Sequence, residues 1–430
     1  MALALAASAA AADITFTVPL IGTGAPGSNL GGGKSSSTEL NGPEGVVAAA
    51  GGGVYVSDTR NNRVLHVSGS GKVTLFAGSG REESTGDGGP ATAGGLLRPT
   101  ALVVDGGGVV IAEPFRVRKV DGAGNVKTIG GTGIPGYGGD GGPAVNAKFD
   151  TIGGLSIATD NGTLVADTNN HRIRRIDPGG SVTTVAGTGS EGFSGDGGSA
   201  KAATLSAPSD VAALPNGGYV FSDLGNGRIR WVDADGAIST IAGGGSRTPT
   251  SAAIAPSELE ITPVGVAVSG ASIAFTNEVE DSPGQLVEIA NGKAKQIAES
   301  GNCSGTRVLC LPHAVSAARG GWLVSDANGH AVYFVGSAQP PIPAVGVALS
   351  LKKVRACGKK AVCAKLLTSQ KIRITFQVRA KSRWTTVATK SVSVGQRSLK
   401  LKGRTPVKRG MSYRMLVAKQ PKSTVTGKLK

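Results

Sequence analysis

The feature that most constrains this chain is a repeat of about 56 residues that runs through its first three quarters. A glycine mark recurs in steps of 56, 53, 56, 56 and 56 residues, at Gly24, Gly80, Gly133, Gly189, Gly245 and Gly301. A polar anchor at the end of an apolar run recurs in the same register, at Asp58, Glu113, Asp167, Asp223, Asn277 and Asp326. Two series of residues that recur together at the same spacing indicate a repeat fold.

Each repeat unit contains four short runs of strand character separated by turn residues. In the third unit we expect strands over residues 154–159, 163–167, 171–177 and 181–186. Four strands in a unit of this length are typical of a propeller blade. The last unit lacks a fourth strand, and an unpaired one stands at residues 14–21. The sequence therefore predicts an all-β, six-bladed propeller that its N-terminal strand closes.

The distribution of charge divides the chain in two. Residues 337–430 carry 23 Lys and Arg and no Asp or Glu; the other 22 cations and all 29 acids lie in residues 1–336, a net of −7 against +23. The prolines of residues 337–343 stand at the boundary and predict a linker. Residues 344–430 alternate apolar with cationic residues, as in KIRITFQVRA, and predict a small, basic β-sandwich.

The repeat unit has a recognisable signature. The stretches VADTNNHRIRRID, VSDTRNNRVLHVS and FSDLGNGRIRWVD, together with GTG and GDGG marks, resemble the NHL repeat of bacterial extracellular proteins. The resemblance covers residues 14–336 and implies a six-bladed propeller. Two units depart from the pattern: the second is two residues short after Glu113, and the fifth is three residues long after Asn277. We expect atypical turns in those two blades. The C-terminal residues resemble, more weakly, immunoglobulin-like or fibronectin-like modules of secreted proteins.

The N-terminus and the cysteines point to an exported protein. Residues 1–12 resemble the end of a secretory signal, with Ala10-Ala11-Ala12 as its cleavage site. No stretch reaches the length of a membrane span. The cysteines form two close pairs, for which we predict disulfides; free thiols or a metal site are the alternatives: Cys303 with Cys310, and Cys357 with Cys363. These observations predict a secreted or cell-surface protein, whose mature propeller occupies residues 13–336.

Two sets of loops are expected to share one face of the propeller, where any ligand would bind. One set is the turns between the second and third strands; the other is the Asp-Gly links between blades. The candidate residues are Asn62, Asn170, His171, Asp87, Asp140 and Asp196. The three aspartates either bond backbone amides and link adjacent blades, or contribute to Ca²⁺ binding. We predict no other cofactor.

Arginines stand five residues after three anchors and are expected to form ion pairs within their blades, at Arg63, Arg172 and Arg228. Most histidines occupy repeated positions; His313, directly after Pro312, is the exception. No catalytic set of residues stands out. We therefore expect a non-enzymatic binding or scaffold protein of the cell envelope, with a protein or glycan ligand.

The basic C-terminal residues are expected to bind anionic wall polymers by releasing counterions. Specific nucleic-acid binding is not expected, because the few aromatic residues fit core positions. The alternative function is a lactonase-like hydrolase or a lyase with a metal in the central channel.

Overall fold

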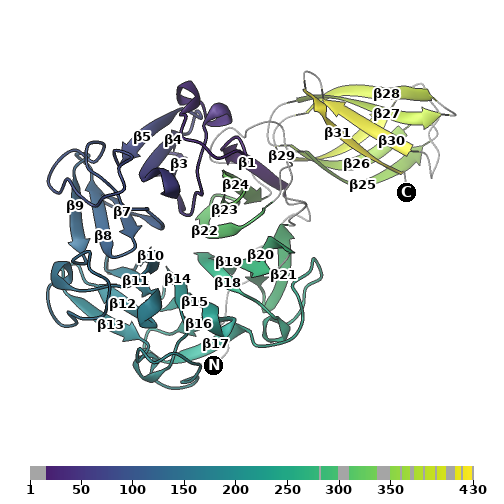
Figure 1. The fold of residues 1–430 in the computed structure, drawn as a ribbon. Coiled ribbons are helices and arrows are strands. Elements are labelled where there is room, and N and C mark those ends of the chain that lie inside the picture. Colours follow the sequence, from purple (N-terminus) through teal and green to yellow (C-terminus); the bar gives the residue numbers. More distant parts are fainter. Residues whose placement is uncertain are drawn as a thin grey trace.

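The computed structural model describes residues 16–279, 282–298 and 309–336, and beyond them the backbone of the strands between residues 349 and 428. The described residues between 16 and 336 form six four-stranded antiparallel sheets arranged as a ring (Figure 1). The sheets are the blades of a propeller, numbered 1 to 6 from the strand that follows β1. The all-β, six-bladed prediction is confirmed.

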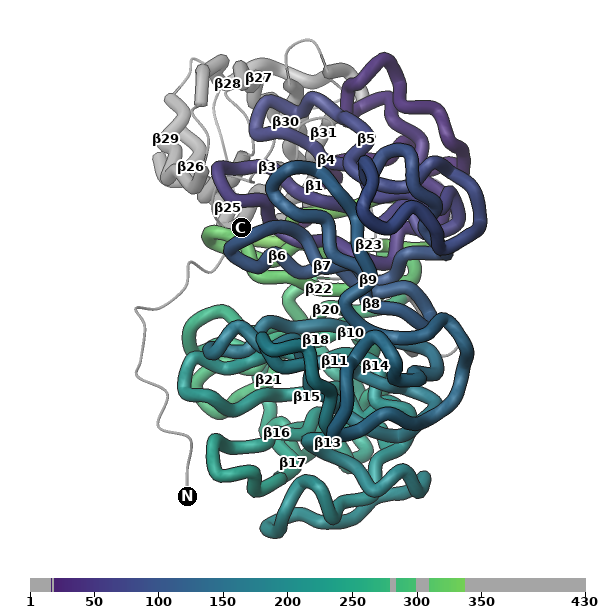
Figure 2. Tube along the Cα trace, turned by 90° about the vertical axis from the view of Figure 1, so that its left-hand side faces the viewer, coloured from purple at the N-terminus to yellow at the C-terminus, as the bar shows by residue number. Residues whose placement is uncertain are grey.

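The strands of each blade follow one another from the centre of the ring outward. Blades 1 and 2 consist of β2 (Val46–Ala48), β3 (Gly53–Asp58), β4 (Arg63–Ser68), β5 (Val73–Ala77), β6 (Leu102–Asp105), β7 (Gly108–Glu113), β8 (Arg116–Asp121) and β9 (Val126–Gly130). Blades 3 and 4 consist of β10 (Ile152–Ile157), β11 (Thr163–Asp167), β12 (Arg172–Ile176), β13 (Val182–Ala186), β14 (Pro208–Ala213), β15 (Tyr219–Asp223), β16 (Arg228–Val232) and β17 (Ile238–Gly243). Blade 5 consists of β18 (Pro263–Ser269), β19 (Ser272–Val279), β20 (Ser282–Ala290) and β21 (Lys293–Ala298). In the turned view of Figure 2, blades 2 and 3 face the reader.

Blade 6 is assembled from both ends of the ring. It contains β22 (Pro312–Ala318), β23 (Gly321–Asp326), β24 (Ala331–Gly336) and, outermost, β1 (Phe16–Ile21). β1 pairs antiparallel with β24, with Phe16 opposite Gly336 and Ile21 opposite Val332. The predicted closure by the N-terminal strand is confirmed, and it covers the edge that β24 would otherwise expose.

Short 3₁₀ turns complete the ring. Those between second and third strands are η3 (Thr59–Asn61), η5 (Thr168–Asn170) and η7 (Leu224–Asn226); those before or between blades are η1 (Gly31–Gly33), η2 (Ser35–Ser37), η4 (Ala144–Asn146), η6 (Ala200–Ala202) and η8 (Pro256–Glu258). Blade 2 has no 3₁₀ turn after Glu113, and β19 and β20 of blade 5 form a longer hairpin. The two atypical turns are therefore where the repeat lengths predict them. No helix in the described residues is long or apolar enough to cross a membrane.

The core is divided among the seams of the ring. A cluster of buried apolar side chains lies between every two neighbouring blades of the described propeller. At the closing seam, Leu20 of β1 and Val332 of β24 join Val46 and Val56 of blade 1 in one such cluster. Most of these side chains are Val, Ile, Leu or Ala, and a few are aromatic, such as Phe149, Phe221 and Phe275.

Seven strands are described beyond Gly336: β25 (Leu349–Gly358), β26 (Ala361–Thr368), β27 (Ile372–Ala380), β28 (Arg383–Val392), β29 (Gly395–Lys402), β30 (Ser412–Val417) and β31 (Gln420–Lys428). Their sheets have the orders β25-β26-β29 and β28-β27-β30-β31. The sandwich with an immunoglobulin-like or fibronectin-like fold stays a prediction. The signal remnant, the linker and Cys303 lie outside the described residues, as do the side chains of Cys357 and Cys363, so the disulfides stay predictions too.

Candidate functional site

The six anchors are buried, and each accepts a hydrogen bond from the backbone just before its blade's innermost strand. In blade 3, Asp167 accepts the N–H of Asp150 at 2.8 Å, and in blade 4 Asp223 accepts that of Ser206 at 2.8 Å. In blade 5 the amide oxygen of Asn277 accepts the N–H of Thr262 at 2.7 Å. The anchors thus fix where each inner strand enters the ring, which is a structural role.

The residues of the Asn-rich turns bond to neighbouring loops. Asn170 donates to Asp167 and to the carbonyl of Gly136 in the preceding link, at 2.8 and 2.9 Å. The next residue, His171, has a left-handed backbone and accepts the N–H of Ala207 in blade 4 through Nδ1, at 3.0 Å. Asn62 is also left-handed and accepts the N–H of Arg98 at 3.0 Å. These candidate ligand residues therefore join consecutive blades.

The three link aspartates face buried arginines of the following blade. Asp87 pairs with Arg118 at 2.7 Å, Asp140 with Arg174 at 2.6 Å, and Asp196 with Arg230 at 2.7 Å. Each of these arginines also contacts the anchor of its own blade: Glu113 at 3.1 Å, Asp167 at 3.4 Å and Asp223 at 3.0 Å. A buried guanidinium between two carboxylates thus ties each of blades 2, 3 and 4 to its incoming link. Ca²⁺ would have to displace a guanidinium from each aspartate.

The electrostatic environments of the two carboxylates differ. Burial raises the pKa of Asp167 to about 6, even though backbone and side-chain hydrogen bonds and Arg174 oppose that effect. Asp140 is less buried, and bonds from Thr184 and Arg174 outweigh its desolvation and hold its pKa below the usual value.

The predicted ion pairs need one correction. Arg63 pairs with Asp58 at 2.7 Å, as expected. Arg172 and Arg228 do not pair with their anchors; they lie over the rings of Tyr137 and Phe193, at 3.7 and 3.9 Å from the ring centroids. The anchors of those blades are taken by the arginines two residues further along the strand. In blades 1, 5 and 6 the position equivalent to Arg174 is apolar or aromatic: Leu65, Val287 and Tyr333.

The central channel is the other candidate site, and here the sequence analysis missed a residue. The innermost strands of the six blades run in the same direction. In each blade, the second residue after the proline that opens this strand (Ile152 in blade 3) occupies the equivalent position around the channel. The six residues at this position are Gly45, Ala101, Gly154, Asp210, Gly265 and Ala314. All but Gly154 line the cavities of the channel, and Gly154 lies against Asp210. Five members are Gly or Ala, and the sixth is a carboxylate. An alignment of the six units would have revealed Asp210 as the exception.

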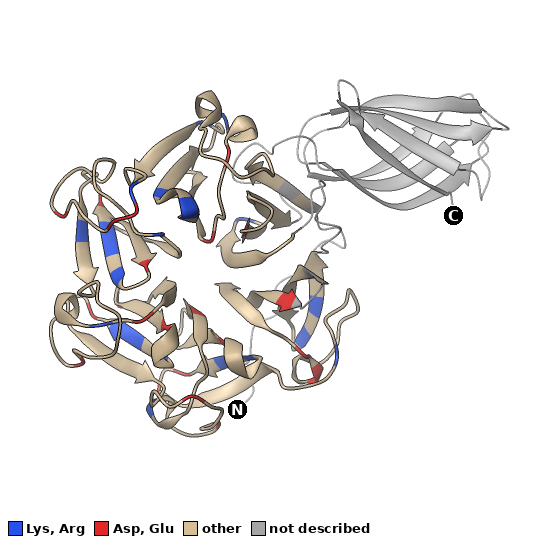
Figure 3. Cartoon of the chain, in the orientation of Figure 1, with Lys and Arg blue, Asp and Glu red and all other residues tan. Residues whose placement is uncertain are grey.

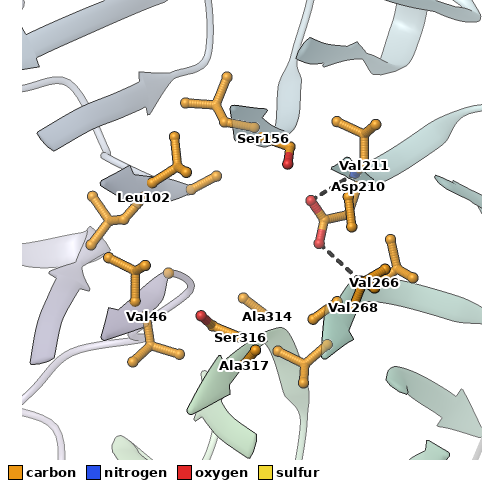
Figure 4. A pocket seen from close by; sticks show the side chains of 18 of the residues that line it. Val46, Leu102, Ser156, Asp210, Val211, Val266, Val268, Ala314, Ser316 and Ala317 are labelled. Atoms are coloured by element: carbon orange, nitrogen blue, oxygen red, sulfur yellow. Dashed lines mark hydrogen bonds between the residues drawn. The ribbon is translucent and has the colours of Figure 1, made fainter. Parts of the chain in front are cut away.

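Asp210 is held by backbone donors. Its carboxylate accepts the N–H of Val211 at 2.8 Å and that of Val266 in blade 5 at 2.9 Å, as Figure 4 shows. A Cβ on Gly154 of blade 3 would lie 2.0 Å from a carboxylate oxygen of Asp210, so the glycine provides the space for this side chain. The inner strands carry only one other acid, Asp105, and are otherwise uncharged (Figure 3).

Two cavities meet at Asp210. The smaller, of about 20 Å³, lies at the entrance of the inner strands, where Glu44 and His313 stand among its lining residues. The larger, of about 200 Å³, extends from Asp210 toward the carboxyl ends of the inner strands at Val268 and Ala317. Its polar side chains are Asp210, Ser156 and Ser316, and the rest of its lining is aliphatic or glycine (Figure 4). The larger cavity thus points away from the Asn-rich turns, where a ligand was expected. No group of three or more potential metal ligands occurs among the described side chains.

The Asp210 carboxyl is expected to make the propeller less stable as the pH rises from about 4 to about 7. Burial raises its pKa to about 7 against two backbone hydrogen bonds. The folded chain therefore holds this proton more tightly than the unfolded chain, and that contribution is lost as the pH passes through the folded-state pKa. Asp210→Asn removes the titration. The melting temperature of the native chain should fall relative to that of Asp210→Asn over this range, and parallel curves would contradict the expectation. Asp167 titrates in both proteins, so its effect on the melting temperature cancels when the two are compared.

Comparisons with known proteins agree with the fold. Residues 40–67 match the family model described as NHL repeat. The chain is 36% identical over 102 residues to Protein SUPPRESSOR OF QUENCHING 1, chloroplastic, of Arabidopsis thaliana, covering 23% of this chain and 10% of that protein. It is 27% identical over 229 residues to Teneurin-1 of Mus musculus, covering 47% of this chain and 8% of that protein. The chain thus spans about a tenth or less of these curated relatives.

Solved structures share the ring at low sequence identity. A Bacteroides thetaiotaomicron protein of unknown function superposes with a TM-score of 0.54 at 15% identity, over 75% of this chain and 76% of that one. An auxiliary nutrient binding protein from the same organism gives a TM-score of 0.51 at 10% identity, again over 75% and 76%. At these identities the likeness shows the fold alone.

Proposed function

We propose that this chain is an exported, non-enzymatic binding protein of the cell envelope, in which the propeller binds a ligand and the basic C-terminal residues attach to anionic wall polymers. The observation that carries the proposal is the charge division: 23 cations and no acids in residues 337–430, after a propeller segment of net charge −7. A polycation gains affinity for a polyanion by releasing its counterions. The acidic propeller segment would be repelled by the same surface and left free for a ligand.

The propeller supports a binding role through its channel. Asp210 stands in a mainly aliphatic cavity with two serines, an arrangement typical of small-molecule sites, in which a few polar groups orient a ligand among apolar walls. The auxiliary nutrient binding protein from Bacteroides thetaiotaomicron shares the ring, so this fold is compatible with such a role. The same proposal also covers a protein or glycan ligand that binds the face formed by the Asn-rich turns and the Asp-Gly links.

Co-sedimentation of the full chain with purified, teichoic-type anionic cell walls tests the attachment. A variant with Lys352, Lys359, Lys360 and Lys422 changed to Gln should sediment less and depend less on salt, because fewer counterions are released. The matched control carries the same change at four propeller lysines, Lys72, Lys127, Lys201 and Lys293, and should bind like the native chain.

Equal losses in both variants, or sedimentation that 1 M NaCl does not reduce, would contradict electrostatic attachment through the C-terminal residues. Hydrolysis of a lactone by the purified chain, with bound metal by elemental analysis, would instead favour the lactonase-like alternative.

A further inference from the structure

Asp210, which is half-buried beside the channel, differs from the buried acids of the propeller in having no cation beside it. Asp58, Glu113, Asp167 and Asp223 each pair with an arginine, and Asp326 has His330 nearby. Within the described residues no ion pair involves Asp210, and its bonds come from two backbone N–H groups. Each of its oxygens therefore keeps acceptor capacity. A carboxylate that is partly withdrawn from water and has no cation beside it costs free energy unless it is protonated or meets a cation.

The space beside Asp210 suits a small organic molecule. The larger cavity measures about 200 Å³, and an apolar cavity of about 150 Å³ can hold benzene. Its walls are built mainly from aliphatic side chains: Val46, Leu102, Leu155, Val211, Val266 and Val315. The Ser156 hydroxyl, one of the few polar groups there, already accepts the N–H of Ala213 at 2.9 Å.

From these contacts we infer that the central channel binds a small primary ammonium ion, with its –NH₃⁺ group on the Asp210 carboxylate and its apolar part along the aliphatic walls. This inference rests on the proposed role of the propeller as a binding module, and it is independent of the basic C-terminal residues. The ammonium group has three donors and can bond both carboxylate oxygens.

The lining discriminates between kinds of cation. Ca²⁺ takes six to eight oxygen ligands, several of them usually from the protein, and one carboxylate among mainly aliphatic groups offers few of these. Quaternary ammonium groups are typically held by aromatic cages, and the residues that line the larger cavity include no aromatic side chain. A primary ammonium with an apolar substituent satisfies both the carboxylate and the walls.

Few other titratable groups face this site. The strands on either side of Asp210, β10 and β18, carry none, and neither does β2. β15 contributes Tyr219 and Asp223, the latter paired with Arg230, and β6 contributes Asp105, which bonds Lys119. β22 carries His313, which with Glu44 lines the smaller cavity. The pH dependence of amine binding should therefore follow mainly Asp210.

Calorimetric titration of the full chain with benzylammonium and with benzyl alcohol, which is close to it in shape and uncharged, tests the inference. Benzylammonium should bind more tightly than the alcohol at pH 8. Its affinity should fall about tenfold from pH 8 to pH 6, because a carboxyl with a pKa of about 7 becomes protonated. Asp210→Asn should lose the preference for the amine and still bind the alcohol.

A second variant separates loss of charge from loss of fold. Ser316 faces the channel in Figure 4, and Ser316→Phe should fill the cavity and abolish binding of both probes, with the circular dichroism spectrum unchanged. Equal affinity for amine and alcohol, undiminished amine binding by Asp210→Asn, or no binding of either probe at millimolar concentration would overturn the inference. Wall sedimentation is measured separately, so failure here leaves the proposed attachment intact, and the reverse also holds.

Discussion

Replacing Arg174 with methionine is expected to destabilise the propeller by about 3–5 kcal/mol, because it leaves two carboxylates without their shared cation. The Arg174 side chain is fully buried and bonds Asp140, Asp167 and the carbonyls of Gly138 and Lys148. Methionine fills much of the same volume without a charge. Without Arg174, Asp167 would be a buried negative charge with no cation beside it, so it would take up a proton. The loss of stability should therefore be largest at high pH, where protonation costs most. Urea denaturation followed by circular dichroism measures it.

The adjacent residue provides the matched control. Arg175 lies on the same strand, is partly exposed and pairs with the exposed Asp160. Surface ion pairs of this kind contribute about 0–1 kcal/mol, so Arg175→Met should have little effect. Comparable losses in the two variants would show that the buried triad adds no stability beyond that of an ordinary surface pair.

Removing β1 is expected to prevent the ring from folding as a monomer. A chain that starts at Gly22 exposes the edge of β24 and loses Leu20 and Ile21 from the closing seam, both fully buried. Loss of such a side chain costs about 2–5 kcal/mol, and two losses approach the whole stability of a typical domain, about 5–15 kcal/mol. Size-exclusion chromatography with light scattering should show aggregates or strand-exchanged oligomers.

A chain that starts at Asp13 keeps β1 and serves as the control; it should be monomeric. Leu20→Ala in the longer chain tests the same seam less severely and should lower stability by about 2–5 kcal/mol. A monomeric chain from Gly22 with an unchanged melting temperature would show that the pairing of β1 with β24 is dispensable.

The architecture could be predicted because repetition samples one pattern six times. A single unit such as blade 5, with Asn277 as anchor and a longer hairpin, would be ambiguous alone. The register of the other anchors identifies it as a blade and places its extra residues in a turn. Closure of the ring by β1 could also be predicted, because the last repeat lacks its fourth strand and an extra strand precedes the first repeat.

The contacts of the arginines could not be predicted from spacing. Arg172 and Arg174 lie on the same side of β12, because side chains alternate along a strand, so both are candidates for Asp167. The choice depends on the preceding link, where Tyr137 stacks on Arg172 and Asp140 bonds Arg174. Blade 1 has Leu65 in place of the second arginine, and there Arg63 takes the anchor.

Asp210 carried a sequence signal that a search for histidine clusters does not detect. Its importance lies in what the other five blades have at that position, glycine or alanine. Nothing in the sequence shows that the space beside it remains open, since that depends on how six inner strands pack around the channel.

The buried arginines divide the ring into two arcs of different chemistry. Blades 2, 3 and 4 are joined to their links by guanidinium–carboxylate triads, whereas blades 5, 6 and 1 have Val287, Tyr333 and Leu65 at the same place. Protonation of these carboxylates would weaken their pairing with the arginines. Blades 2, 3 and 4 thus form a continuous arc in which the contact between each blade and its incoming link depends on protonation, and the other three blades lack this contact at the same position.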